Sequence, residues 1–299
     1  MVSVVITTCR RAPEILNRAV RSVLCQTYSD WELIIVDDSP ESYEERAAVR
    51  QMIEQMKDDR IRYIAHEVNK GACASRNTGL AAAEGKYIAY LDDDDEWLPE
   101  KLATQVQKAE ETDSDTAVIY CSWYVKDDKT GVTTAKKLEV HRGWVYDSLI
   151  LINYIGSTSF PLIRTECLRE IGGFDPLMQS SQDYDAWLRL AARYRIDCVE
   201  EPLACYHRYD GERITTNIPQ KIAGLERLNE KNLTYLRNHP EAFAVRYMKL
   251  AVKYTQSGQM GKALKIWWGA FVKCPWRVVQ NLKYLIYILR EHKKCVTKR

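Results

Sequence analysis

Short apolar runs rich in β-branched residues alternate with amphipathic stretches through the first hundred residues of the chain. The apolar runs predict strands at residues 2–8, 32–36, 61–65 and 86–91. The stretches between them carry apolar residues three and four apart, which predicts helices at 13–26, 41–56 and 72–83. This alternation predicts an α/β fold, a Rossmann-like and mostly parallel sheet with helices on both faces.

The pattern changes twice in the rest of the chain. Strands are predicted at 117–125 and 157–163, and a strongly periodic helix at 182–194. Everything beyond residue 215 has a helical pattern. We therefore expect three parts, residues 1–105, 106–214 and 215–299, of which the last is an α-helical extension.

The composition excludes several classes of protein. A chain of 299 residues, 46% hydrophobic and 28% charged, is neither a disordered protein nor a coiled-coil rod. No apolar run reaches the roughly 18 residues of a membrane-spanning helix. The nine cysteines are scattered without a C-x-x-C pair, which argues against a disulfide framework and a zinc ribbon. No basic segment of a secretory signal follows Met1, so we expect a cytoplasmic protein.

The net charge of +2 conceals an uneven distribution. Residues 215–299 contain 17 Lys and Arg but only 4 Asp and Glu, a net charge of +13. Residues 1–214 contain 26 basic and 37 acidic residues, a net charge of −11. The acidic part is suited to a cation, and the basic part to phosphates or an anionic membrane surface.

Polar residues follow three of the predicted strands. Residues 7–10 follow the first strand, Asp37 and Asp38 the second, and Asp92–Asp95 the fourth. Ligands of parallel sheets bind beyond the carboxyl ends of the strands, so these clusters predict one site. The five acids of residues 92–96 repel one another without a cation, and their oxygens suit Mg²⁺ or Mn²⁺. The alternative is a solvated acidic turn before the next helix.

The absence of G-x-G-x-x-G after the first strand excludes most dinucleotide-dependent oxidoreductases. Three segments instead resemble family 2 glycosyltransferases of the GT-A fold, the inverting type found in bacterial surface-polysaccharide synthesis. They read V-S-V-V-I-T-T-C-R-R at residues 2–11, S-V-L-C-Q-T-Y-S-D-W-E-L-I-I-V-D-D-S at 22–39 and N-K-G-A-C-A-S-R-N-T-G-L-A-A-A-E-G-K-Y-I-A-Y-L-D-D-D-D-E-W-L-P at 69–99. The resemblance is continuous over 1–105 and patchy to about 210.

The resemblance implies binding of a nucleotide-diphosphate sugar, with UDP as the expected nucleotide, and a divalent metal, Mn²⁺ or Mg²⁺. Residues 1–105 correspond to the nucleotide-sugar half of a GT-A domain and 106–214 to the acceptor half. By position, Asp94 is the expected metal ligand. The expected nucleotide contacts are Thr7, Thr8, Cys9, Arg10, Asp38, Arg76, Asp92 and Asp93. Alternatives from the residues alone are a helix N-cap for Asp38 and an exposed helical arginine for Arg76.

The second half contains an acceptor-side segment similar to that of the family. A turn, G-G-F-D at residues 172–175, is followed by Q-D-Y-D-A-W-L-R-L at 182–190. The resemblance makes Asp183 the general base that deprotonates the acceptor hydroxyl, and an inverting displacement needs one such carboxylate. Gln182 replaces the usual Glu. The expected acceptor contacts are Gly173, Phe174, Gln182 and Tyr184, and the expected acceptor is a glycan or lipid-linked glycan.

Each of two segments outside these motifs has two possible interpretations. His207 is either a third metal ligand or a surface histidine. The helical region 262–299 combines tryptophans and bases, which suits peripheral contact with a membrane or packing on the catalytic domain. The acidic catalytic part argues against nucleic acid as a partner. Competing functions are a sugar-nucleotide nucleotidyltransferase, which would need a glycine-rich loop after the first strand, and a non-catalytic scaffold that binds nucleotide sugar.

Overall fold

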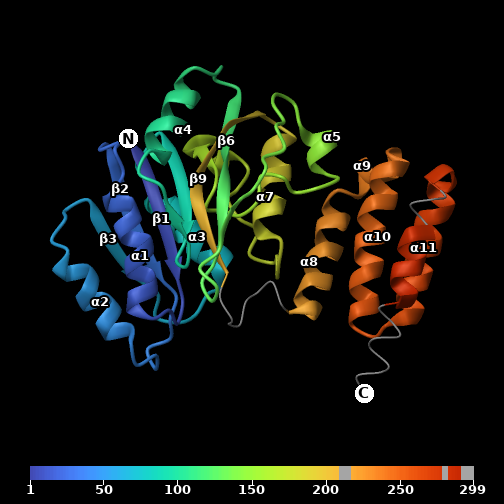
Figure 1. The fold of residues 1–299 in the computed structure, drawn as a ribbon, viewed down its shortest axis with the longest axis horizontal. Coiled ribbons are helices and arrows are strands. Elements are labelled where there is room, and N and C mark those ends of the chain that lie inside the picture. Colours follow the sequence, from blue (N-terminus) through green and yellow to red (C-terminus); the bar gives the residue numbers. More distant parts are fainter. Residues whose placement is uncertain (209–216, 278–281, 291–299) are drawn as a thin grey trace. The chain divides into compact units, whose positions relative to one another are not determined.

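The structure is a computed structural model that describes residues 1–208, 217–277 and 282–290. Its elements follow the chain in the order shown in Figure 1. They are β1 (Val2–Thr8), α1 (Pro13–Leu24), β2 (Trp31–Asp37), α2 (Arg46–Gln55), β3 (Ile61–Ala65), α3 (Ala72–Ala82), β4 (Tyr87–Asp92), β5 (Glu96–Trp97), α4 (Lys101–Glu110), β6 (Thr116–Asp127), β7 (Thr133–Ala135), α5 (Tyr146–Leu149), β8 (Leu162–Arg164), α6 (Thr165–Glu170), α7 (Gln182–Ala191), β9 (Arg195–Arg208), α8 (Ile218–Lys231), α9 (Leu233–Asn238), α10 (Pro240–Gln256), α11 (Met260–Lys273) and the 3-10 turn Pro275–Arg277.

The strands form one mixed sheet in the order β3-β2-β1-β4-β8-β6-β9-β5, with β7 beside β6. Strands β3, β2, β1 and β4 are parallel, as the alternating pattern predicts. Strand β8 runs antiparallel to both of its neighbours, β4 and β6, while β6 and β9 are parallel to each other. The mostly parallel α/β prediction is therefore confirmed for the first half and holds with exceptions in the second.

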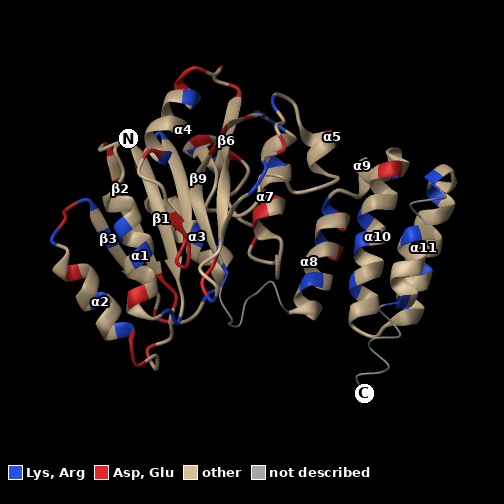
Figure 2. Ribbon diagram, in the orientation of Figure 1, with Lys and Arg blue, Asp and Glu red and all other residues tan. Residues whose placement is uncertain are grey.

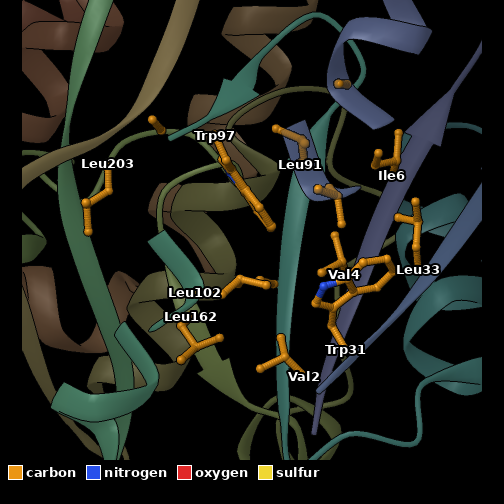
Figure 3. Packing of buried hydrophobic residues seen from close by; sticks show 14 of the residues in the cluster. Val2, Val4, Ile6, Trp31, Leu33, Leu91, Trp97, Leu102, Leu162 and Leu203 are labelled. Atoms are coloured by element: carbon orange, nitrogen blue, oxygen red, sulfur yellow. The ribbon is translucent and has the colours of Figure 1, made fainter. Parts of the chain in front are cut away.

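Alternate residues of β1 enter two different hydrophobic layers. Val2, Val4 and Ile6 join α1, α4 and neighbouring strands in a large buried cluster, part of which Figure 3 shows. Val5 points to the opposite face, where α3 packs. A Cβ at Gly79 of α3 would lie 2.3 Å from Val5 Cγ1, so only glycine lets this helix approach the sheet so closely. Helices thus cover both faces, as expected.

Two predicted elements differ from the structure. The helix expected at 41–56 begins only at Arg46, because residues 41–45 form turns. The strand expected at 157–163 is reduced to Leu162–Arg164. Its first half is a turn whose hydroxyl groups bind carboxylates: Ser157 and Thr158 donate to Asp92, and Ser159 donates to Asp95. β9, the long strand at Arg195–Arg208, was not predicted at all.

Contacts within the chain divide it into two compact units. Unit 1 comprises residues 1–176 and 183–210, and unit 2 comprises 177–182 and 211–299. The later part of unit 2, from residue 217 on, is mainly helical where it is described, and two small apolar clusters hold α8, α10 and α11 together around Leu250 and Met248. Within the described residues, no helix has both the length and the apolar character that crossing a bilayer requires. The expected break at residue 105 lies inside unit 1.

Candidate active site at the carboxyl ends of the strands

The ends of β1, β2 and β4 lie side by side. The sheet pairs Thr8 with Asp37 and Thr7 with Asp92, so the polar residues that follow these strands meet at one edge. This is the edge at which parallel sheets bind ligands. The convergence predicted from the strand pattern is therefore present in the fold.

The turn after β1 connects to both neighbouring loops. The Thr8 hydroxyl donates to Asp93 Oδ2 at 2.7 Å, and the Cys9 thiol contacts the Asp38 carbonyl at 3.5 Å. Arg10 donates its backbone N–H to Ser39 Oγ at 2.8 Å and has a φ of 52°. A non-glycine residue with left-handed φ is strained, and such residues cluster at functional sites. Thr7 is half-buried beside them.

Asp38 is almost completely buried and is not a helix cap. Its Oδ1 accepts hydrogen bonds from the backbone N–H of Lys70 and from His66 Nδ1, and its Oδ2 accepts from the Gly71 N–H at 2.8 Å. The carboxylate therefore ties the end of β2 to the start of α3.

Asp92 is the most strongly bound carboxylate of the acidic run. It accepts from Ser157 Oγ at 2.6 Å and Thr158 Oγ1 at 2.9 Å, and it pairs with Arg76 at 3.2 Å. Burial alone would raise the pKa of Asp92, but the Arg76 charge and the two hydroxyl bonds outweigh burial and lower it. The Arg76 side chain is 12% exposed, so the alternative of an exposed helical arginine is wrong.

Asp93 and Asp94 share one cation, Arg11. The Arg11 guanidinium lies 2.8 Å from Asp93 Oδ1 and 3.3 Å from Asp94 Oδ2. Burial raises the pKa of Asp93 to about 6 despite the opposing effect of Arg11. Arg18 donates to the Asp94 carbonyl at 2.5 Å and fixes the loop from α1. Asp94 keeps a partly exposed side chain at this edge.

His207 is buried and ion-paired, so the expectation of a surface histidine is wrong. Its ring nitrogens lie 2.8 Å from Glu96 Oε1 and 2.6 Å from Asp128 Oδ1. Burial by itself would lower the pKa of His207, but hydrogen bonds with Cys205, Glu96 and Asp128 raise it to about 10. The His207 ring thus joins β5, β9 and the residue that follows β6, directly beside the acidic loop. Glu96, Cys205 and His207 are spaced as a metal could bind them, yet the two ion pairs already satisfy the histidine.

Asp183 lies in the first turn of α7, and its Oδ2 accepts from Asn153 at 3.3 Å. Burial raises the pKa of Asp183, and the charge of Asp92 adds to this, while backbone hydrogen bonds and Arg76 oppose it. Asn153 also donates to the Gly156 carbonyl, and the next residue, Ser157, donates to Asp92, so this short segment connects Asp183 with Asp92. Ser181, two residues earlier, has a φ of 57°, the second such strained residue next to the site.

The four expected acceptor contacts have different environments. Phe174 is fully buried between Tyr90 and Trp187, and the Tyr184 ring is buried with its hydroxyl on the Leu149 carbonyl. Both rings belong to the core, so their direct contact with an acceptor stays a prediction that their burial does not support. Gly173 has a φ of 66° and packs against Asn77, where a Cβ would lie 2.5 Å from Oδ1. Gln182 donates to the Met178 carbonyl.

Several residues that complete the site are not among those predicted from the sequence. Arg11 directly follows the predicted turn, so its position was a usable signal. Ser157 and Thr158 lie 65 and 66 residues from Asp92, and Asn153 lies 30 residues from Asp183, so no local pattern marks them. His66 follows β3 by one residue, which is the same strand-end signal that identified Asp38.

The residues present fit a divalent metal. The acidic loop offers carboxylate oxygens, which Mg²⁺ and Mn²⁺ prefer, and Asp92 and Asp94 are its partly exposed aspartates. Asp92 accepts from two hydroxyl groups and pairs with Arg76, whereas Asp94 pairs with Arg11 at 3.3 Å. The role of Asp94 as a metal ligand stays a prediction from the family resemblance.

Relatives of known description share most of the chain. WcaA of Escherichia coli (strain K12), named as a glycosyl transferase of colanic acid biosynthesis, is 34% identical over 75% of this chain and 78% of its own. TuaG of Bacillus subtilis (strain 168), named as a glycosyltransferase of teichuronic acid biosynthesis, is 31% identical over 62% of this chain and 70% of its own. WfgD of Escherichia coli is named UDP-Glc:alpha-D-GlcNAc-diphosphoundecaprenol beta-1,3-glucosyltransferase. It is 27% identical over 69% of this chain and 76% of its own.

A solved structure supports the same assignment of fold. Residues 1–349 of TarS from S. aureus, in complex with UDP-GlcNAc, match with a TM-score of 0.69 at 15% identity. The match covers 97% of this chain and 89% of that one, and it confirms the GT-A type of fold. The family model "Glycosyl transferase family 2" matches residues 3–171, more than half of the chain. The strand-end site, the fold and these relatives agree, and the protein belongs to glycosyl transferase family 2 and is a glycosyltransferase.

Proposed function

We propose that this glycosyltransferase moves a sugar from a UDP-sugar to a hydroxyl of a lipid-linked glycan, with inversion, with a bound Mn²⁺ or Mg²⁺, and with Asp183 as the general base. The observation that carries the proposal is a series of contacts from Asp183 to the strand-end carboxylates. Asn153 donates to Asp183 and to the Gly156 carbonyl, and the adjacent Ser157 donates to Asp92, the partner of Arg76. A base and a diphosphate site must adjoin if one displacement is to use both.

The donor end of the reaction rests on the loops after β1, β2 and β4. The Thr8–Arg10 turn and the loop after Asp38 would hold the nucleoside, and Arg76 and Arg11 would orient the diphosphate. TarS was solved with UDP-GlcNAc and with UDP, which supports a uridine nucleotide for this fold. Asp94 would hold the metal, which when bound supplies Lewis-acid neutralisation of the departing diphosphate.

The acceptor end rests on Asp183. Its raised pKa suits a carboxylate that takes a proton, because a more basic group is the better proton acceptor. Asn153 donates to its Oδ2 and helps to orient the carboxylate. WfgD is named for transfer to a diphosphoundecaprenol-linked sugar, which supports an acceptor of that class here. Such acceptors place the reaction on the cytoplasmic membrane surface.

Calorimetric titration of UDP, with and without Mn²⁺, tests the donor site on the wild type and on Asp94→Ala. We expect tight binding that requires the metal and is lost in the variant. Asp30→Ala is a matched control, since this exposed aspartate pairs only with the N-terminus among the described contacts. Binding that ignores both metal and variant would overturn the metal assignment. Metal-dependent binding without transfer to any acceptor would favour the scaffold alternative.

A further inference from the structure

Helix α11 exposes a row of apolar side chains one turn apart. Leu264, Trp268 and Val272 are 37%, 58% and 58% exposed, and Trp276 in the following 3-10 turn is 63% exposed. We call these four residues the α11 stripe. The opposite side of the helix carries Ala263 and Ala270, which are fully buried against the rest of unit 2. The stripe is therefore not needed to hold the helix in place.

The next helical segment repeats this pattern. Within the described residues 282–290, Leu282, Ile286 and Leu289 are 47%, 50% and 46% exposed, whereas Ile288 is fully buried. Their spacing of four and then three residues places them on one side of a helix. Two consecutive helices that both expose apolar rows mark an interaction surface, because soluble domains rarely leave such surface uncovered.

The charges beside these rows are all positive. Residues 242–290 contain nine Lys and Arg and no Asp or Glu. Lys262, Lys265 and Lys273 of α11 are exposed, and Figure 2 shows the basic residues distributed along α10 and α11. Lys265 lies three residues before Trp268 and seven before Val272, so it flanks the stripe. A basic flank beside an exposed Trp-containing apolar row is typical of helices that lie in a membrane interface.

From this surface we propose that unit 2 docks on an anionic lipid membrane, with the α11 stripe in the interface and the lysines on the lipid headgroups. The inference concerns a partner beyond the transfer reaction and does not depend on it. A second copy of the chain fits less well, because its equally basic surface would repel the first. Nucleic acid fits less well too, since it would leave the aliphatic side chains of the stripe exposed.

Co-sedimentation of the full chain with lipid vesicles tests the inference. We expect binding to vesicles of phosphatidylcholine with phosphatidylglycerol, little binding to phosphatidylcholine alone, and weaker binding at high salt. Trp268→Ser with Trp276→Ser removes aromatic surface, and Lys265→Glu with Lys273→Glu reverses charge. Each pair is expected to weaken vesicle binding on the order of tenfold or more.

Two controls match these variants. Lys136→Glu with Lys137→Glu makes the same charge change at exposed lysines of unit 1, and Trp144→Ser removes a tryptophan that is 65% exposed. Both controls should bind vesicles as the wild type does. Absence of vesicle binding, equal binding to both kinds of vesicle, or equal loss in the controls would overturn the inference. So would self-association in ultracentrifugation that Trp268→Ser abolishes without any vesicle binding. UDP titration of each variant separates a failure here from a failure of the donor site.

Discussion

The Asp183 carboxyl combines a pKa that burial raises with a hydrogen bond from Asn153. Asp183→Asn removes the proton acceptor while keeping the size of the side chain, so we expect kcat to fall about 10²–10⁴-fold with UDP affinity unchanged. Steady-state transfer and UDP titration measure the two effects. A loss of UDP binding as large as the loss of rate would point to a structural role instead.

The same pKa direction predicts the pH dependence of the reaction. A general base works only when deprotonated, so kcat/KM should fall as the pH drops through the raised pKa of Asp183. The fall should begin at a higher pH than for an ordinary aspartate, whose pKa is about 3.9. A pH profile of kcat/KM at constant metal concentration measures it, and a profile that is flat down to the ordinary range would contradict the assignment.

His207 makes the stability of the fold depend on pH in the alkaline range. Its pKa is raised from 6.5 to about 10 by its partners in the fold, so its contribution is fully present below 6.5 and is lost as the pH rises through 10. His207→Gln should lower the free energy of unfolding by about 3 kcal/mol at neutral pH, because Glu96 and Asp128 lose their cation. Denaturant unfolding across pH 6–11 checks this, since the variant should show a flatter profile. His141→Gln, at a half-exposed position, is the control.

At the scale of elements, Gly79 decides how closely α3 approaches the sheet. Gly79→Ala should destabilise unit 1 by about 1–3 kcal/mol, because the new Cβ would lie 2.3 Å from Val5 Cγ1. Gly269→Ala in α11 meets nothing within 4 Å and should be neutral or stabilising by up to about 1 kcal/mol. Thermal unfolding of the two variants compares them. Equal effects would show that helix propensity outweighs the clash.

The elements also show which structural features local sequence patterns do not predict. The parallel strands β1, β2 and β4 were predictable because each is a buried apolar run, and β3 because its half-buried residues are mostly apolar. The turn at Ser157–Ser159 has residues that suit a strand, yet its hydroxyl groups are bound by Asp92 and Asp95 instead. Such a competition between side-chain and backbone hydrogen bonds is decided by a distant partner, so no local pattern shows it.

At the scale of the whole molecule, the transfer site and the basic surface belong to different compact units. If both proposals hold, membrane docking raises the concentration of a lipid-linked acceptor around the enzyme. Lys265→Glu with Lys273→Glu should then lower kcat/KM for an acceptor embedded in vesicles about as much as it lowers vesicle binding. With a short water-soluble acceptor it should leave kcat/KM unchanged. Equal losses with both acceptors would argue that the variant disturbs catalysis itself.

The sequence by itself determined the parallel half of the sheet, the strand ends that carry polar residues, the family resemblance and the basic helical end. Each of these is a local property, because it depends on the periodicity or the order of neighbouring residues. Only the tertiary structure decided that Arg11 serves both Asp93 and Asp94, that His207 is a buried imidazolium, and that Phe174 and Tyr184 belong to the core. These facts depend on residues that are far apart in the chain, whose contacts and burial arise only when the sheet forms.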